Sequence, residues 1–301
     1  ERWQGLMRQN PVFYEGQFKN GKKEGRGTMR MVDGATYTGE FKEGDRNGVG
    51  TQTWDGKVYE GQWEDGQPNG EGTLTKAGSI HTGQFRAGNM TQGTIRYENG
   101  DVYTGEGGGD GLSRPNGSGE MIYANGDKYT GMWRAGERHG EGECLYADNS
   151  VYKGTWVEDK RHGKGTFTMR DDVDGNDEVL ETYVGDWEND EKHGQGTLTS
   201  RYPPYTYEGQ WREDKRSGQG TQNDEDGHRY KGQWARDLRE GIGEMLYPNG
   251  DRYYGTWKFG ARLAGVLTYA NGNVYVGEFA RVIFHLNQRN DPSEGEMRYA
   301  D

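Results

Sequence analysis

A short aromatic pattern recurs twelve times along the chain, and it limits the possible folds more than any other feature of the sequence. Each copy begins with Tyr-x-Gly-x-Trp or Tyr-x-Gly-x-Phe, and in most copies Gly-x-Gly follows seven residues after the second aromatic. The tyrosine is replaced only at His81, and the second aromatic only at Gly107. Such repetition is typical of proteins in which each unit packs against its neighbours. The copies begin at Tyr14, Tyr37, Tyr59, His81, Tyr103, Tyr129, Tyr152, Tyr183, Tyr207, Tyr230, Tyr253 and Tyr275.

The spacing within each copy predicts β-strands. Tyr, Gly and Trp stand at positions i, i+2 and i+4, which share one face of a strand, whereas a helix would scatter them and glycine disfavours helices. The second half of each copy, such as Gly119 to Tyr123, also alternates. A polar stretch such as Arg134 to His139 separates the halves and is interpreted as a hairpin loop. Asn-Gly or Asp-Gly pairs mark a tight turn into the next copy, so each copy is predicted to form one antiparallel hairpin.

The composition argues that these hairpins form a single layer. The chain has 53 glycines among 301 residues, and hydrophobic residues make up only 30% of it, although aromatic residues reach 12%. A second layer would need many more aliphatic side chains, so the rings have to pack within the layer, above the glycine positions. We therefore expect an all-β fold, an elongated single-layer antiparallel β-meander of about twelve hairpins that forms a solenoid-like twisted ribbon.

The Tyr-x-Gly-x-Trp, His-Gly-x-Gly and Asn-Gly-x-x-Tyr motifs together resemble the repeats of the MORN family (membrane occupation and recognition nexus) over residues 14–279. The resemblance implies a twisted single-layer β-sheet with a shallow groove on one face. It also implies a scaffold, because members of this family occur in ciliary axonemes and radial spoke heads, at the cell cortex and at membrane junctions. Other members are accessory modules of enzymes such as lipid kinases and lysine methyltransferases.

Departures from the pattern divide the chain into four segments. The Gly-rich insert among them is either a flexible joint or a loop that leaves the sheet unbroken. The run from Val282 to Phe284 is interpreted as a cover for the open sheet edge, or alternatively as a docking element. The segments are 1–105 with N-terminal repeats, 106–116 with the Gly-rich insert, 117–279 with the most regular repeats, and 280–301 with an insert and a terminal capping strand.

Histidine precedes Gly-x-Gly in three successive copies, at His139, His162 and His193, but a shared metal ion is excluded by distance. Equivalent positions of adjacent hairpins lie two strands apart, about 9–10 Å, whereas zinc binds each ligand at roughly 2 Å. We interpret these histidines as turn residues with side-chain hydrogen bonds. In the acidic insert from Asp171 to Glu181, acids match several positions of a calcium-binding loop, but an arginine occupies the first position, so ion binding there stays open.

No catalytic, cofactor or metal site is predicted. Cys144 alternates with glycine and tyrosine on a strand and is interpreted as a packed thiol. It is the only cysteine, which excludes an internal disulfide and favours a reducing, cytoplasmic location. The formal net charge of −12 argues against nucleic-acid binding and against attachment to anionic membrane lipid.

The aromatic face is the best candidate for a binding site. No second layer covers it, and Tyr and Trp dominate the energetics of many interfaces. Aromatic columns separated by glycine troughs would form a groove for an amphipathic helix or an extended peptide. The predicted partner-binding residues are Tyr129, Trp133, Tyr152, Trp156, Tyr183, Trp187, Tyr207, Trp211, Tyr230, Trp234, Tyr253 and Trp257.

We expect a non-catalytic scaffold that binds protein partners through this groove and through the sheet edges, in a ciliary axoneme, a radial spoke or another cytoskeletal assembly. The N-terminal edge, around Trp3 to Tyr14, is expected to pair with a second copy, giving a homodimer, or with a different protein. Arg138 and Lys160 are interpreted as loop charges whose reversal leaves the fold intact and changes association. The alternatives are a phospholipid tether at the cell cortex and the regulatory module of a larger enzyme.

Overall fold

The computed structural model describes residues 11–108, 114–171, 178–279 and 292–299, and the regular elements in these residues are all β-strands. The strands belong to an antiparallel sheet of 24 strands. Strands that are consecutive in the chain pair with each other, as β8 (Asn89–Tyr97) does with β9 (Val102–Gly107). The predicted all-β antiparallel meander is thereby confirmed.

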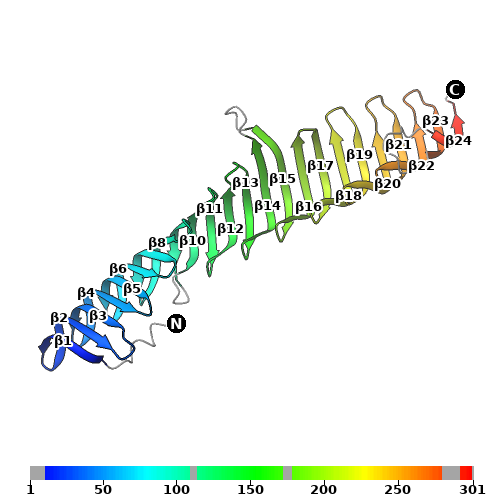
Figure 1. The fold of residues 1–301 in the computed structure, drawn as a ribbon. Coiled ribbons are helices and arrows are strands. Elements are labelled where there is room, and N and C mark those ends of the chain that lie inside the picture. The colour runs from blue at the N-terminus through cyan, green and yellow to red at the C-terminus, as the bar shows by residue number, and fades with distance from the viewer. Residues whose placement is uncertain (1–10, 109–113, 172–177, 280–291, 300–301) are drawn as a thin grey trace. The chain divides into compact units, whose positions relative to one another are not determined.

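The chain divides into two compact units, and Figure 1 draws the strands of both as arrows. Unit 1 takes in residues 1–147 and 156–159, and unit 2 takes in 148–155 and 160–301, so that β13 (Val151–Val157) contributes to both. The other strands of unit 1 are β1 (Pro11–Lys19), β2 (Lys22–Met31), β3 (Thr36–Lys42), β4 (Asp45–Trp54), β5 (Lys57–Glu64), β6 (Gln67–Lys76), β7 (Ser79–Arg86), β8, β9, β10 (Pro115–Ile122), β11 (Lys128–Arg134) and β12 (Glu137–Leu145). The other strands of unit 2 are β14 (Lys160–Asp171), β15 (Glu178–Glu188), β16 (Glu191–Arg201), β17 (Pro204–Arg212), β18 (Lys215–Asp224), β19 (Arg229–Ala235), β20 (Leu238–Leu246), β21 (Arg252–Lys258), β22 (Ala261–Thr268), β23 (Val274–Phe279) and β24 (Pro292–Arg298).

Glycines stand opposite one another across neighbouring strands, and in most repeats a tyrosine ring lies over the pair. In unit 2, Gly209 of β17 pairs with Gly220 of β18. A Cβ atom added to Gly220 would lie 2.5 Å from Cζ of Tyr207, and one added to Gly209 would lie 2.5 Å from the Cα of Gly220. Both distances are far below van der Waals contact. Only glycine leaves room for the ring at these positions, as the repeat pattern predicts.

The hairpin turns are shorter than the sequence predicts. The stretch from Arg134 to His139 is predicted to be a loop, but β11 and β12 continue into it, and Arg134 pairs with Glu137. Only Ala135 and Gly136 form the turn, with φ of 53° and 96°. Two residues with positive φ are typical of a tight turn whose twist matches that of the flanking strands. The polar residues of this stretch therefore belong to strands.

Several predicted features lie outside the described residues. They are the N-terminal edge from Trp3 to residue 10, the centre of the Gly-rich insert at 109–113, the acidic residues 172–177 and the run from Val282 to Phe284. The predictions about them stay predictions. Beyond the last of these segments, β24 pairs with β23 in antiparallel register.

Candidate functional site

Tyrosine and tryptophan rings of successive repeats pack edge to face along the sheet, and we call this arrangement the ring ladder. In unit 2, the ring of Tyr207 lies 5.1 Å from that of Trp211 in its own repeat and 5.4 Å from that of Trp234 in the next repeat. The interplanar angles are 87° and 86°, so the positive edge of one ring meets the negative face of another. Each tyrosine thereby joins two neighbouring repeats.

All twelve residues that were predicted to bind a partner belong to the ring ladder, and all are buried, with exposed fractions between 0% and 5%. A partner on this face would therefore mainly meet the side chains that cover the rings. Unit 1 holds Tyr129, Trp133 and Trp156, and unit 2 holds Tyr152, Tyr183, Trp187, Tyr207, Trp211, Tyr230, Trp234, Tyr253 and Trp257.

The polar atoms of the buried rings are hydrogen-bonded to the backbone. Nε1 of Trp234 donates to the carbonyl of Gly220 at 3.2 Å, in the preceding repeat. The hydroxyl of Tyr207 donates to the carbonyl of Gln210 at 3.0 Å, which turns the ring back over its own strand. An unpaired polar group would be costly at such depth, so these bonds allow the rings to be buried completely.

A positively charged residue covers most of the rings, a role that the repeat pattern alone does not indicate. It stands five residues after the second aromatic and pairs with it across the hairpin, as Arg216 does with Trp211. The guanidinium of Arg216 lies 4.4 Å from the ring of Trp234 and 5.7 Å from that of Tyr207, within the range of cation–π attraction. The same position is filled by Lys23, Arg46, Arg138, Arg161, Lys192, Arg216, Arg239 and Arg262.

The interpretation of Arg138 as a loop charge is wrong. Arg138 lies in β12, its guanidinium is 4.1 Å from the ring of Trp156, and 20% of its side chain is exposed. The prediction failed because the loop predicted from Arg134 to His139 is longer than the actual turn and therefore included Arg138. Reversal of this charge would place a carboxylate against an aromatic face and therefore weaken the fold. Lys160, by contrast, is exposed.

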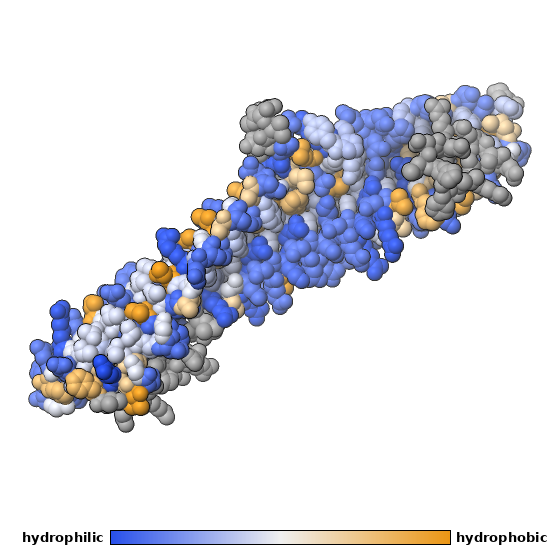
Figure 2. Space-filling model, in the orientation of Figure 1, coloured by the Kyte–Doolittle hydropathy of each residue, from blue (hydrophilic) through white to orange (hydrophobic). Residues whose placement is uncertain are grey.

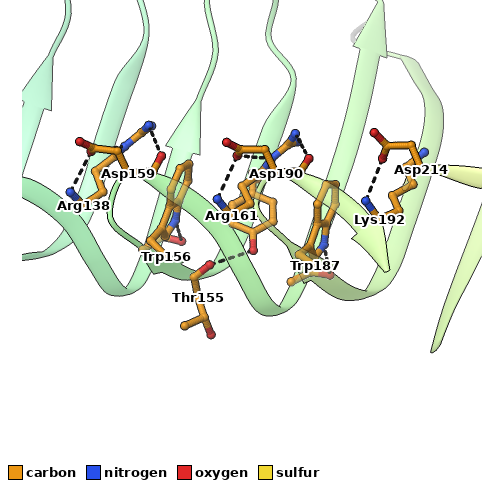
Figure 3. A network of polar contacts seen from close by, with 12 residues as sticks. Arg138, Thr155, Trp156, Asp159, Arg161, Trp187, Asp190, Lys192 and Asp214 are labelled. Carbon is orange, nitrogen blue, oxygen red and sulfur yellow. Dashed lines mark hydrogen bonds and ion pairs between the residues drawn. The ribbon is translucent and has the colours of Figure 1, made fainter. Parts of the chain in front are cut away.

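Aspartates of the next hairpin turn hold several of these cations in place (Figure 3). Nε of Arg161 lies 3.1 Å from Oδ1 of Asp190, and a terminal nitrogen of the same guanidinium donates to the Asp190 carbonyl at 2.7 Å. The backbone N–H of Arg161 donates to the same carboxylate at 2.9 Å. Charge-assisted bonds of this kind tie one repeat to the next. The same three contacts join Arg138 to Asp159 and Arg216 to Asp237.

Removal of one cation tests how much this cover stabilises the ladder. Arg216→Met keeps an apolar stem of similar length but loses the cation–π contact and the ion pair, so we expect unit 2 to lose about 1–2 kcal/mol. The measurement is urea unfolding followed by tryptophan fluorescence. Arg212→Met is the control, because the Arg212 side chain is 73% exposed, and its change is expected to stay within about 0.5 kcal/mol. Equal losses in both variants would contradict a specific role for the covering cation.

Burial also changes the titration of the ladder tyrosines. It raises the pKa of Tyr253 from 10.0 to about 12, and it raises the pKa of Tyr183 and Tyr207 in the same direction. Because the folded state favours the neutral phenol, this contribution to stability is complete below pH 10.0 and is lost as the pH rises through the folded pKa. We therefore expect the melting temperature to fall steeply above about pH 10. Thermal melts at stepped pH measure this, and an unchanged melting temperature up to about pH 12 would contradict it.

Cys144 and the three histidines that precede Gly-x-Gly all lie within strands. Cys144 is buried, and burial raises the pKa of its thiol, so the predicted packed thiol is confirmed. His139, His162 and His193 lie in β12, β14 and β16, so their interpretation as turn residues is wrong. The reason is again the short turn, which leaves these positions within strands. Nδ1 of His193 lies 3.3 Å from a carboxylate oxygen of Glu188.

Among the described residues, one cluster brings three candidate metal ligands within 4.8 Å of one another: Asp224, Asp226 and His228. Oδ1 of Asp226 accepts hydrogen bonds from the backbone N–H of His228 at 3.2 Å and lies 2.8 Å from its Nδ1. In another repeat, Asn249 accepts the corresponding backbone bond from Asp251 at 3.1 Å. The cluster is therefore explained by the needs of the turn and is not assigned as a metal site.

The outer surface is mostly hydrophilic, and Figure 2 shows hydrophobic residues scattered among polar ones on the visible face. On the sheet face away from the ladder in unit 2, Tyr254 of β21 pairs with Val266 of β22, which pairs with Val276 of β23. Tyr254 is 56% exposed and Val276 is 38% exposed. In the described part of the chain there is no helix that is long and apolar enough to cross a membrane.

Comparison with protein families gives one clear match. The model of the MORN repeat matches nine segments of the chain, which together cover more than half of it. The matched segments are 14–36, 37–56, 59–78, 113–128, 129–151, 152–172, 183–201, 207–229 and 230–252.

Comparison with individual proteins adds little. No curated protein sequence matches the chain. Among solved structures, the TCP domain of SAS-4 (dCPAP) of Drosophila melanogaster, in complex with a proline-rich motif of Ana2 (dSTIL), is 13% identical, covers 52% of this chain and 81% of its own, and has a TM-score of 0.31. The TCP10 domain of Danio rerio CPAP, in complex with a peptide of STIL, is 11% identical, covers 81% of this chain and 93% of its own, and has a TM-score of 0.32. Such low scores transfer no function.

Proposed function

Because the chain belongs to the MORN repeat family, we propose that it is a non-catalytic scaffold whose repeats bind other proteins along the ring ladder and at the sheet edges. In this proposal the twelve ladder residues Tyr129 to Trp257 shape the binding face from below. The cations above them supply the contacts. The ring ladder then serves stability and recognition together, because the same rings that hold the sheet also position the cations.

The regular spacing of these half-buried cations is the observation that carries the proposal. In unit 2, Arg161, Lys192, Arg216, Arg239 and Arg262 occupy the same place in successive hairpins. Equivalent places lie two strands apart, about 10 Å. Seven residues of an α-helix rise about 10.5 Å, and three residues of an extended strand rise about 10 Å. A partner segment with acidic or carbonyl groups at either interval would therefore meet one cation in each repeat.

We propose a cytoskeletal assembly as the setting, with the ciliary axoneme and the radial spoke as the first places to search, on the basis of the family resemblance. Pairing of the N-terminal sheet edge with a second copy or with another protein belongs to the same proposal. Attachment to phospholipid and service as the regulatory module of an enzyme are the competing outcomes.

Site-specific photo-crosslinking in native extracts tests the proposal. A photoreactive residue at Tyr205, which stands two positions before Tyr207 and so shares the ladder face of β17, should yield adducts with cytoskeletal proteins. The same residue at Glu208, on the opposite face of β17, is the matched control and should yield far fewer. Adducts found only at Glu208 would contradict binding along the ladder. Flotation with anionic vesicles without protein adducts would favour the lipid tether, and capture of a catalytic domain would favour the enzyme module.

A further inference from the structure

The row of covering cations is interrupted in three successive repeats of unit 1: Pro68 stands opposite Trp63 and Met90 opposite Phe85, and the third gap is in the repeat that begins at Tyr103. Pro115 pairs with Gly107 there, in the place where most hairpins pair a cation with the second aromatic. The ring that such a cation would cover is Trp133 of the next repeat. Among the described residues, no lysine or arginine lies within cation–π range of Trp133, whereas Arg138 lies 4.1 Å from Trp156.

The vacant position opens into a cavity of about 670 Å³ that is widely open to solvent. Its wall includes the aromatic rings of Trp133, Tyr97 and Tyr123 and the backbone of Gly136. The volume exceeds that of one side chain, so the cavity has room for a side chain together with part of the segment that carries it.

Arg46, which occupies the equivalent position elsewhere in unit 1, shows which contacts a covering cation makes there. The backbone N–H of Gly66 donates to the Arg46 carbonyl at 3.0 Å, and the guanidinium of Arg46 donates back to the Gly66 carbonyl at 2.5 Å. Its guanidinium also lies 4.7 Å from the ring of Trp63. Gly136 stands in the place of Gly66, three residues after its aromatic, and donates to the Pro115 carbonyl at 2.9 Å. The acceptor and the ring are thus both present without a guanidinium.

The charges around the cavity also suit a cation. Glu98, Asp101 and Asp159 line it. Asp159 already binds Arg138, and Asp101 accepts the backbone N–H of Ala124 and the side-chain N–H of Asn99, both at 2.8 Å, whereas Glu98 is exposed. Burial of a positive group beside several carboxylates is favourable, and burial of a negative group there is not.

One basic residue stands at the rim. Arg114 is exposed, and its Cδ lies 3.6 Å from the place that a Cβ atom of Gly136 would take. It stands beside Pro115 at the start of β10 and is the internal competitor for the cavity, so the experiment has to include it.

We propose that this cavity receives an arginine side chain of a partner protein. The guanidinium lies over Trp133, donates to the carbonyl of Gly136 and is balanced by Glu98 and Asp101. Arginine is the occupant because its planar fork reaches a ring face and a backbone carbonyl at once, as Arg46 does within this chain. The inference rests on the proposed function, since it names the chemistry of one partner contact.

The probe is an acetylated and amidated pentapeptide, Gly-Gly-Arg-Gly-Gly, added to the full chain. Binding is followed by NMR through the indole N–H resonance of Trp133, which Trp133→Phe identifies. The citrulline peptide, which keeps the shape but loses the charge, is expected to bind at least about tenfold more weakly. Glu98→Gln is expected to weaken binding of the arginine peptide severalfold. Equal binding of the two peptides would overturn the proposal.

Restoring the missing cation gives a second, independent test. Pro115→Arg supplies an internal guanidinium, so peptide binding should be lost. Pro68→Arg is the matched control, because Pro68 stands opposite Trp63 in a different hairpin and its replacement should leave binding unchanged. Peptide binding that persists in Pro115→Arg would overturn the proposal. Binding that appears only in Arg114→Gln would show that Arg114 fills the cavity, and would also overturn it.

The peptide-binding and crosslinking experiments test the arginine site and the scaffold proposal separately. Loss of peptide binding together with protein crosslinks at Tyr205 would refute only the arginine site. Peptide binding without such crosslinks would refute binding along the ladder and keep the arginine site.

Discussion

Gly220→Val is expected to destabilise unit 2 by about 3 kcal/mol or more, because the new side chain has no space. Its Cβ atom would lie 2.5 Å from both Cζ and Cε2 of Tyr207. The ring of Tyr207 cannot move aside, since it is packed between Trp211 and Trp234 at 5.1 and 5.4 Å. Circular dichroism melts should show a loss of roughly 6–12 °C, given the usual relation between free energy and melting temperature for a unit of this size.

The neighbouring residue is the matched control for this change. Thr221→Val places the same valine side chain on the opposite face of the same strand, where Thr221 pairs with Lys231. Its effect is expected to stay within about 0.5 kcal/mol. If the two variants melted at the same temperature, the close contact between the glycine pair and the tyrosine ring would not limit the fold.

Trp187→Ala is expected to cost unit 2 about 3–5 kcal/mol, the usual range for a large aromatic side chain removed from a packed site. The ring of Trp187 lies 5.2 Å from that of Tyr183 and 5.3 Å from that of Tyr152. Its Nε1 donates to the Gly165 carbonyl at 3.2 Å, and the Arg161 guanidinium lies 4.3 Å from the ring. The alanine variant loses all of these contacts together. Urea unfolding measures the loss.

A conservative change separates the ring from the rest of the contact. Trp187→Phe keeps an aromatic ring under Arg161, and phenylalanine fills the same position in other copies, at Phe41 and Phe85. Its cost is expected to be about 1–2 kcal/mol. Tyr254→Ala, at an exposed ring on the opposite face, is the control and should change stability little. A phenylalanine variant as unstable as the alanine variant would show that edge-to-face packing is not the main contribution.

The fold could be predicted from the sequence because the same alternating pattern recurs in every repeat and determines its secondary structure. Tyr, Gly and Trp at alternate positions require a strand, and the lack of aliphatic residues requires a single layer. The site could be predicted only in part. The rings were correctly assigned to one face, but their burial depends on residues such as Arg216 that come from the other strand of the hairpin. Cross-strand pairs of this kind follow from the exact turn length, which polar residues around Ala135 do not reveal.

Most tyrosines of the ladder contact the aromatic of their own repeat and that of the following one, as Tyr207 does, and arginines such as Arg161 reach the turn of the following hairpin. Stability within a unit is therefore close to a sum of equal neighbour terms, as in a one-dimensional lattice. Deletion of one whole period, such as residues 207–229, would bring Tyr230 into the environment that Tyr207 has now. Duplication or loss of one repeat would therefore lengthen or shorten the sheet by one hairpin, while the remaining repeats keep equivalent neighbours.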